Sequence, residues 1–231
     1  MPQVYYDFHI HSALSPCGQD DMTPNNIVNM ALLKGLDAIA VCDHNSTKNV
    51  GAIAKVAGAA GLTFIPGMEM TTAEEVHVLA LFETVVQAEA FGELIYDALP
   101  EIPNKPDYFG NQLIMDEEDR ITGTLEKLLI SALPFDLEAC CTMAAQYGGY
   151  TIPAHINKGA NSILANLGFF PRQISFRTIE VVKGLRIDND ISGFQQIHSS
   201  DAHDLAQISE RVYFIEPEAN TAASILKKLC V

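Results

Sequence analysis

The stretch VYYDFHIH, residues 4–11, begins as an apolar run and ends in two histidines separated by one residue. In a β-strand, side chains two positions apart point to the same face, so His9 and His11 would present two imidazoles side by side. Both would lie at the C-terminal end of the strand. This segment alone leaves two interpretations open: part of a metal site, or a pair of solvent-facing histidines on a strand edge.

Similar β-rich runs alternate with helical patterns along the rest of the chain. Thr23 followed by Pro24 is typical of an N-cap with proline at the first helical position, and this helix should run to Lys34 and end at Gly35. Strands separated by helices favour a mainly parallel sheet with the helices outside it. The predicted strands are residues 4–10, 36–42, 62–66, 75–82, 150–154, 178–182, 194–198 and 211–215.

One stretch interrupts this alternation. Residues 98–131 are rich in proline, asparagine and acidic residues, and we expect an insertion there with a small hairpin that pairs residues 112–115 with residues 120–122. The sequence contains no internal repeat and no strong linker. We therefore predict a single α/β domain over residues 1–231, with an insertion at about residues 98–131.

Composition restricts the environment and the partners. The formal net charge of −15 predicts an acidic surface that repels phosphate backbones and disfavours nucleic acid, although bound divalent metals would offset part of that charge in an active site. No apolar run approaches the roughly 18 residues of a membrane span, and the N-terminus has no signal-peptide pattern. We expect a cytoplasmic protein without a membrane partner. The five cysteines, odd in number, should be free thiols.

Ionisable residues recur where the predicted strands end. The candidates are His9 and His11, Asp43 and His44, Glu69, His77, His155, and Asp201 and His203. In barrels of alternating strands and helices, function lies at the C-terminal ends of the strands. His77 differs because it lies within an apolar strand, where a buried imidazole needs a partner. Independent core histidines would give this arrangement only by chance, so the sequence predicts a metal site.

The chemistry of these side chains indicates which metals they would hold. Nitrogen and oxygen donors suit Zn, Mn or Fe and disfavour a soft thiolate site. One ion takes three or four protein ligands, so this set implies two or three ions, and Glu69 could bridge two of them. The sequence has no Walker-type phosphate loop and no nucleophilic serine or cysteine with an unliganded histidine partner. We therefore predict hydrolysis by metal-bound hydroxide.

The ordered series resembles the PHP family, which is named after the domain shared by bacterial DNA polymerases and histidinol phosphatase. The residues that carry the resemblance are His9-x-His11, Asp43-His44, Glu69, His77, His155 and Asp201-x-His203. It spans essentially the whole chain and is closest to the small stand-alone phosphoesterases. It implies a distorted (β/α)7 barrel, a trinuclear metal site at the C-terminal ends of the strands, and hydrolysis of phosphoesters.

The resemblance also implies which residues hold which metal. The sets are His9, His11, Glu69 and Asp201 for the first metal, Glu69, His77 and His155 for the second, and His44 and His203 for the third. The family takes one more ligand from the loop after the first strand. Here that loop reads SPCGQDD, residues 15–21, and we predict Asp20 as the ligand, ahead of Asp21 and Cys17. His198 matches no ligand position and is expected to be structural.

We therefore expect a metal-dependent phosphoric ester hydrolase that acts on a small phosphorylated metabolite or nucleotide with two or three Zn, Mn or Fe ions. Asp43 is the catalytic candidate, because beside His44 it would orient that ligand or help to move a proton. Lys158, three positions after His155, is the candidate for contact with the substrate phosphate, and a solvated surface lysine is the alternative. Two other functions stay open: a non-phosphate metallohydrolase of the same barrel type, and a non-catalytic metal-binding module.

Overall fold

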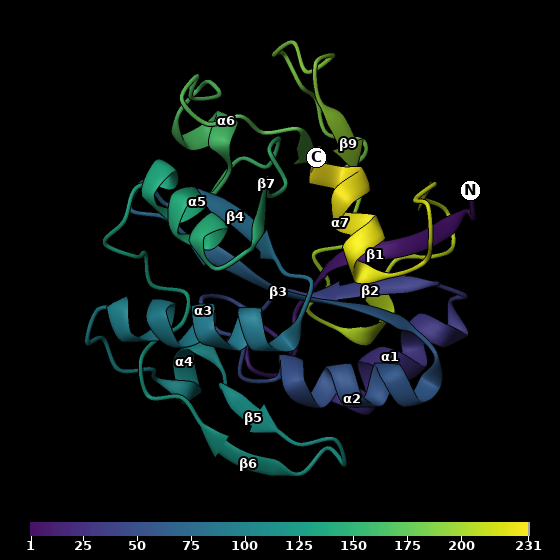
Figure 1. Ribbon diagram of the computed structural model, residues 1–231. Helices are drawn as coiled ribbons and strands as arrows, with labels where there is room; N and C mark the ends of the chain where they lie inside the picture. Colours follow the sequence, from purple (N-terminus) through teal and green to yellow (C-terminus); the bar gives the residue numbers. More distant parts are fainter. Residues whose placement is uncertain (231) are drawn as a thin grey trace.

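A curled mixed sheet with helices packed around it forms the centre of the computed structural model, which describes residues 1–230 (Figure 1). The strand order is β10-β1-β2-β3-β4-β7. These strands are β1 (Val4–Ile10), β2 (Ala38–Val41), β3 (Thr63–Thr71), β4 (His77–Leu81), β7 (Tyr150–Pro153) and β10 (Phe214–Ile215). The α/β prediction is confirmed, but the sheet is mixed and not mainly parallel. β1, β2 and β3 run parallel, whereas β4 is antiparallel to both of its neighbours.

Several of the helices begin at a capping side chain, such as those that start after Thr23, Thr84, Asp136 and Ser162. The helices are α1 (Pro24–Leu33), α2 (Val50–Ala60), α3 (Val85–Ala98), α4 (Pro106–Phe109), α5 (Leu137–Gln146), α6 (Ile163–Asn166) and α7 (Ala222–Cys230), with a 3-10 turn, η1 (Leu205–Gln207). Thr23 accepts a hydrogen bond from the Asn26 amide at the start of α1, as predicted. Gly35 follows that helix with a φ of 71°, a left-handed conformation that glycine adopts without steric cost.

Alternation along the strands divides the core between the two faces of the sheet. Tyr6 and Phe8 of β1 lie in one apolar cluster with Ile225 and Leu229 of α7. Ile39 and Val41 of β2 lie in another cluster, together with apolar side chains of α1 and α2. Each fully buried large apolar side chain contributes roughly 1.5–3 kcal/mol, so these two clusters fix the strands whose ends carry the histidines.

The turn between β3 and β4 determines the direction in which β4 runs. The two strands pair from Gly67 with Leu81 to Thr71 with His77, and only residues 72–76 connect them. A parallel crossover needs a dozen or more residues, so this short connection forces an antiparallel pair. As a result, β4 starts at the edge where β1 and β2 end, and His77 lies at that edge although it is the first residue of its strand.

The remaining strands form two small separate sheets. β8 (Thr178–Glu180) pairs in parallel with β9 (Gln195–Ile197), and β5 (Leu113–Met115) pairs antiparallel with β6 (Ile121–Thr124). Together with the main sheet this gives a curled half-barrel. The strand ladders of residues 1–230 do not form the closed (β/α)7 barrel that the resemblance implies. The reversal at β4 and the short pairing of β8 with β9 account for the difference.

The expected hairpin in residues 98–131 is confirmed as β5 and β6. This segment contacts the loops that follow β1 and β2. The Leu113 amide donates to the Ala13 carbonyl at 2.9 Å, and the Asn49 side chain bonds both the Leu113 carbonyl and the Met115 amide. Asn45 donates to the Leu129 carbonyl at 2.7 Å. The segment therefore supports two loops that carry candidate ligands.

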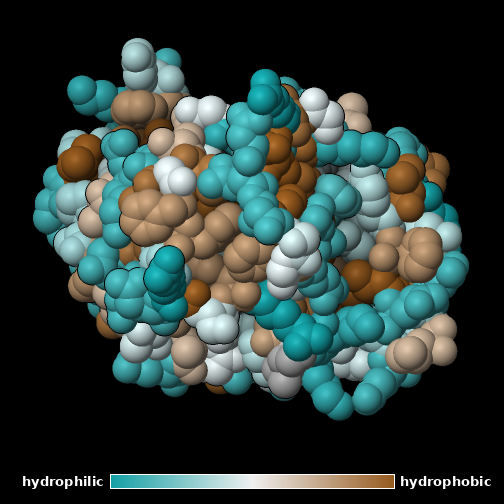
Figure 2. Space-filling view, turned by 90° about the horizontal axis from the view of Figure 1, so that it is seen from above, coloured by the Kyte–Doolittle hydropathy of each residue, from teal (hydrophilic) through white to brown (hydrophobic). Residues whose placement is uncertain are grey.

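The surface is mixed in character. Figure 2 shows one face on which hydrophilic residues surround separate hydrophobic patches. Exposed large apolar side chains are spread over different elements, such as Leu33 of α1, Val86 of α3 and Phe169 after α6. Within residues 1–230, none of the helices has the length and apolar character that crossing a bilayer requires. The five cysteines carry free thiols, and burial raises the pKa of Cys140 to about 12.

Two glycines provide a test of the packing beside the site. A Cβ on Gly67 of β3 would lie 2.6 Å from Cys42 Sγ and 2.9 Å from Leu81 Cδ2, whereas a Cβ on Gly58 of α2 would meet nothing within 4 Å. We expect Gly67→Ala to destabilise the fold by about 1–3 kcal/mol through overpacking. Gly58→Ala should stabilise it by roughly 0.5–1 kcal/mol, because alanine favours a helix. Urea unfolding of both variants measures this, and an equal effect of the two would contradict the packing described.

Candidate metal centre

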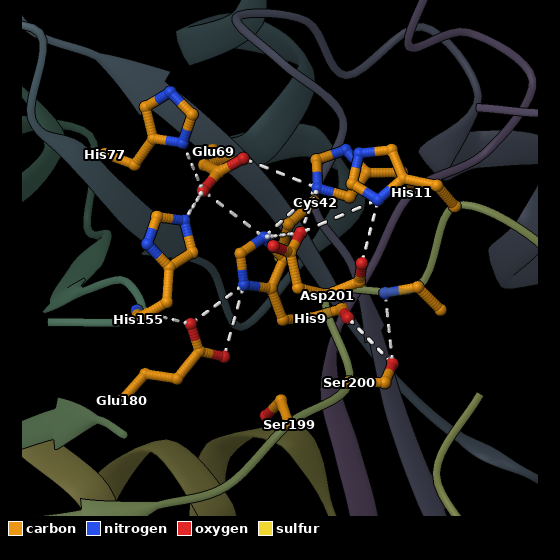
Figure 3. A network of polar contacts seen from close by, with 12 residues as sticks. His9, His11, Cys42, Glu69, His77, His155, Glu180, Ser199, Ser200 and Asp201 are labelled. Carbon is orange, nitrogen blue, oxygen red and sulfur yellow. Dashed lines mark hydrogen bonds and ion pairs between the residues drawn. The ribbon is translucent and has the colours of Figure 1, made fainter. Parts of the chain in front are cut away.

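The candidate ligands converge on Glu69, whose carboxylate is buried among five imidazoles (Figure 3). The neighbours of Oε1 are His77 Nδ1 at 2.9 Å, His155 Nε2 at 3.1 Å and His9 Nε2 at 3.4 Å. The neighbours of Oε2 are His44 Nδ1 at 3.1 Å and His11 Nε2 at 3.4 Å. Residues far apart in the sequence thus meet at one carboxylate.

Backbone pairing beyond the ends of the strands brings the ligands together. The Asn45 amide donates to the Glu69 carbonyl, and the Glu69 amide donates to the Asp43 carbonyl, each at 3.0 Å, so the ladder of β2 and β3 continues past β2. This pairing places His44 beside Glu69. The antiparallel start of β4 brings His77 to the same edge. Glu69 itself lies inside β3 and not in a loop after it, because β3 continues to Thr71.

Two of the candidate ligands have unusual backbone conformations. His155 has a φ of 28° and Asp201 a φ of 53°. Non-glycine residues in this left-handed region cost free energy and tend to occur at functional sites, where the surrounding structure holds them. Here the Lys158 amide donates to the His155 carbonyl at 2.9 Å, and the Ala202 amide donates to the Ser200 hydroxyl oxygen at 3.1 Å. These bonds lie beside the two residues, whose side chains contact Glu69 in the case of His155 and the imidazoles of His9 and His11 in the case of Asp201.

Three groups of side chains have donor atoms within 4.8 Å of one another, which suits shared metal ions. They are His9, His11, Glu69 and Asp201; His44, Glu69 and His77; and His11, His44 and His203. The first group has the same members as the predicted first set. The other two differ in detail, because His44 joins Glu69 and His77, and His11 joins the third group. His155 reaches the centre through its contact with Glu69 Oε1.

Several buried polar atoms at the centre have no hydrogen-bond partner within the described chain. His44 Nδ1 and Glu69 Oε2 are two of them, and His155 Nδ1, the nitrogen of that ring that does not face Glu69, is a third. An unsatisfied buried polar group costs about 1–3 kcal/mol, and a cation held by nitrogen and oxygen would relieve that cost. His9 Nε2 and His11 Nε2 also face each other at 3.1 Å. Two lone pairs at this distance repel unless a proton or a cation lies between them, so the residues fit a metal.

The charges at the centre also indicate that positive charge would be stabilised there. Burial opposes ionisation of Glu69, but His77, His9 and His44 outweigh it and hold the pKa of this carboxyl well below its usual value. Burial also opposes the charged form of His9, yet Glu180, Glu69 and Asp201 raise its pKa well above the usual value. The carboxylates therefore attract positive charge to this position, which a divalent cation supplies.

The pKa values of two other imidazoles, His44 and His203, shift in the opposite direction. Burial lowers the pKa of His44 well below its usual value, with further lowering by the neighbouring histidines His11 and His77. Burial and His11 lower the pKa of His203 to about 4. Both shifts favour the neutral form of the imidazole. Neutral imidazole is the form that binds a metal ion.

A hydroxyl and a carboxylate behind His11 determine which of its nitrogens faces the centre. Asp43 accepts hydrogen bonds from the Ser12 amide at 2.7 Å, the Ser12 hydroxyl at 2.6 Å and the Ser15 hydroxyl at 2.7 Å. Because the Ser15 proton is directed at Asp43, its oxygen accepts from His11 Nδ1–H at 2.9 Å. His11 Nε2 is left as a lone-pair donor. Asp43 therefore lies behind His11 and Ser15, and its part in the reaction stays a prediction.

Some residues of the site were missed by the sequence analysis. Glu180 lies 3.0 Å from His9 Nδ1, and Asp7 binds the Ser200 hydroxyl at 2.6 Å and the Ser209 amide at 2.8 Å. These contacts join positions roughly two hundred residues apart, which no local spacing reveals. The available signal was an acidic residue inside an apolar predicted strand, since a buried carboxylate requires polar partners.

The loop after β1 does not bring its predicted ligand to the centre. Asp20 is exposed and accepts from the Asn111 amide group at 2.9 and 3.1 Å. Neither Asp20, Asp21 nor Cys17 belongs to the three groups found in residues 1–230. The loop is held in place by the Gln19 amide, which donates to the His203 carbonyl at 2.9 Å. The third group consists of His11, His44 and His203, so His11 and not a residue of this loop accompanies the two histidines.

A pocket of about 370 Å³ opens onto the centre. His44, Glu69, His77, His155 and Lys158 are among the residues that line it, and the ammonium group of Lys158 contacts Asp201 Oδ2. His198 lies elsewhere. Its Nδ1 lies 2.7 Å from the Val181 carbonyl and its ring packs against Tyr213, in keeping with a structural role.

Comparison of the sequence and the fold with known proteins finds a matching family model and several similar structures. The sequence matches the PHP domain family model over residues 7–147, and a search of curated proteins finds no match. The structure of the lesion-specific endonuclease Q from Pyrococcus furiosus is similar, with a TM-score of 0.66 and 22% identity over 99% of this chain and 56% of that chain. A Bifidobacterium adolescentis protein proposed to be a metal-dependent phosphoesterase has a TM-score of 0.59 and 16% identity over 97% and 94% of the two chains.

These comparisons overturn the expectation that nucleic acid is disfavoured. A second endonuclease Q structure, with a TM-score of 0.58 and 22% identity over 88% of this chain and 50% of that chain, contains a 27-mer duplex with an abasic lesion at the active site. The chain spans about half the length of these endonucleases. The expectation was wrong because a charge of −15 summed over the chain does not describe the potential at one pocket, which bound cations would make more positive.

A contrast between histidines tests the centre. Loss of a residue that supports a metal ligand typically weakens metal binding roughly 10- to 100-fold. His155→Ala should weaken it at least as much, because His155 contacts Glu69 directly and is itself a candidate ligand. His198→Ala should leave metal binding unchanged. Elemental analysis and chelator competition on both purified variants provide the measurement, with circular dichroism to show that each is folded. Equal losses in the two variants would contradict the site described.

Proposed function

The chain belongs to the PHP domain family, and from this we propose that it is a metal-dependent phosphoesterase. The observation that carries the proposal is Glu69, a buried carboxylate whose two oxygens lie within 3.4 Å of five imidazoles. A centre of this kind suits two or three divalent ions with nitrogen and oxygen ligands, such as Zn, Mn or Fe.

The proposed ligands follow the groups around Glu69. His9, His11, Glu69 and Asp201 would hold one ion, Glu69, His77 and His155 a second, and His44 and His203 a third. When bound, such ions lower the pKa of a water molecule and neutralise charge on a phosphate group in its transition state. The orphaned atoms His44 Nδ1 and Glu69 Oε2 support this assignment, because both are buried at the centre and need a partner.

The polar residues behind the ligands would hold them ready for the reaction. Asp43 orients the Ser15 hydroxyl, which accepts the Nδ1 proton of His11 and leaves Nε2 free. The Asp201 carbonyl lies 2.8 Å from His203 Nδ1 and selects the same tautomer there. We assign Asp43 this positioning role, because its hydrogen bonds to Ser12 and Ser15 occupy it away from the pocket.

Lys158 is the proposed contact for the substrate phosphate. It lines the pocket beside His155, and its ammonium group contacts Asp201 Oδ2. A cation held by Asp201 would compete with the ammonium group for that carboxylate. Lys158 would then be free to approach an anionic group in the pocket, where an ammonium group binds phosphate as a point charge.

We also propose that seven strands surround the centre, as in the distorted barrel of the family. β8, β9 and residues 200–203 would continue the half-barrel from β7 back to β1. Supporting contacts are the Ile156 amide donating to the Glu180 carbonyl at 2.9 Å and the His11 amide donating to the Ala202 carbonyl at 2.9 Å. In this proposal residues 1–231 form one domain, with residues 98–131 as an insertion that supports the loops of the centre.

Two kinds of phosphoester are candidates for the substrate. A pocket of about 370 Å³ has room for a small phosphorylated metabolite or a nucleotide. The fold shared with endonuclease Q favours a DNA phosphodiester as the second candidate. Both would place one phosphate at the same centre, so the reaction class is the same and the substrate needs a direct comparison.

The reaction is tested with metal-free protein that is reloaded with Zn²⁺, Mn²⁺ or Fe²⁺. We expect more than one equivalent of metal per chain and hydrolysis of at least one substrate in a panel of sugar phosphates, nucleotides, phosphodiesters and a DNA duplex with an abasic lesion. A chelator should abolish the activity, and His155→Ala should lack it. Activity that survives complete metal removal, or a protein that binds no metal after reconstitution, would refute the proposal.

The role of Lys158 is tested by its removal. Lys158→Ala should raise KM for the best substrate with a smaller effect on kcat, because the lost contact is made to the phosphate before and during the reaction. Lys55→Ala is the matched control, since Lys55 is exposed and pairs with Glu117 on the far hairpin. Steady-state kinetics of both variants give the comparison. An unchanged KM in Lys158→Ala would assign this lysine to the surface.

A further inference from the structure

Glu180 is a buried carboxylate that belongs to none of the proposed ligand sets. It is the last residue of β8, only 1% exposed, and its chain neighbours Ile179 and Val181 are buried apolar residues. No lysine or arginine pairs with it anywhere in residues 1–230. A carboxylate in such surroundings needs strong polar partners to be tolerated, so its actual partners indicate what it does.

Both oxygens of Glu180 bind candidate metal ligands. Oε1 and Oε2 lie 3.1 and 3.0 Å from His9 Nδ1, and Oε2 also accepts from the His155 backbone amide at 2.8 Å. Figure 3 shows this carboxylate between the two histidines, on the side away from Glu69. One side chain on β8 thus holds a residue of β1 and a residue that follows β7.

The contact to His9 selects a tautomer. Because a carboxylate accepts hydrogen bonds, His9 Nδ1 carries the proton when the ring is neutral, and Nε2 presents its lone pair. Nε2 lies 3.4 Å from Glu69 Oε1 and 3.4 Å from Asp201 Oδ1. Glu180 therefore aims the donor atom of His9 at the two carboxylates of the first group.

The contact to His155 stabilises a strained turn. His155 has a φ of 28°. The Glu180 side chain accepts a hydrogen bond from the His155 amide, and the Glu180 backbone carbonyl accepts one from the Ile156 amide at 2.9 Å. These two bonds secure the point where β7 ends. They keep His155 Nε2 at 3.1 Å from Glu69 Oε1.

We propose that Glu180 is a positioning residue that orients His9 and His155 together, and so couples the first proposed metal set to the second. The inference rests on the proposed metal-binding function of these two histidines. A glutamine in place of Glu180 would keep one acceptor oxygen, but it would lose the negative charge, and its NH2 group would face a donor, either His9 Nδ1–H or the His155 amide. Two ligands at different metals would then lose part of their support from a single change.

The test measures Zn²⁺ affinity by chelator competition on the metal-free full chain. Glu180→Gln should weaken binding about 10- to 100-fold, as is typical of residues behind metal-bound histidines. Glu216→Gln, which neutralises an exposed glutamate, should leave it unchanged. In a His9→Ala background, Glu180→Gln should weaken binding by a smaller factor, because part of its effect passes through His9. A purely structural role would give the same factor in both backgrounds.

A second variant keeps the inference testable if Glu180→Gln does not fold. Glu180→Asp retains the charge but shortens the side chain by one carbon, so it should also weaken Zn²⁺ binding. Wild-type affinity in either folded variant, or equal factors in the two backgrounds, would overturn the positioning role while leaving the proposed function intact. A wild-type chain that binds no Zn²⁺ would overturn both, and the two failures are thereby distinguished.

Discussion

The buried carboxylate of Glu69 is the constraint on which the rest of the site depends. An ionised group in a protein interior costs several kcal/mol unless opposite charge and hydrogen bonds surround it. No lysine or arginine within the described chain supplies that charge, and imidazoles from β1, β4 and the loops after β2 and β7 surround it instead. The strand ends have to converge for this carboxylate to be tolerated, and a cluster of candidate metal ligands follows from the same arrangement.

The reversal at the turn between β3 and β4 makes this convergence possible. In a regular barrel every strand presents its C-terminal end to the site. Here β3 continues past Glu69 to Thr71, and the chain turns back at once so that His77 begins β4 beside it. The carboxylate and its imidazole partner, Nδ1 to Oε1 at 2.9 Å, are thus held by a continuous antiparallel ladder. A ladder varies less in geometry than two independent loops, which suits a bridging position.

The sequence predicts the parts of this site that depend on local spacing. His9 and His11 share a face because alternation in a strand requires it, and the positions of His44 and His155 follow from the ends of apolar runs. The direction of β4 could not be predicted from the apolar pattern, which is the same for parallel and antiparallel strands. Glu180 was missed because its contact with His9 spans 171 positions. The preference for Asp20 in the loop after β1 rested on residue type, and the structure pairs that carboxylate with Asn111 instead.

The supporting residues explain how a crowded set of histidines keeps a defined arrangement. His9 and His11 are adjacent on one strand face, and each has a different carboxylate behind it: Glu180 directly, and Asp43 through Ser15. Both contacts engage Nδ1, so both Nε2 atoms turn inwards and meet at 3.1 Å. Each carboxylate stabilises a proton on the outer nitrogen, so when both rings are neutral their inner lone pairs repel each other. This geometry costs folding free energy, and a bound cation would offset that cost.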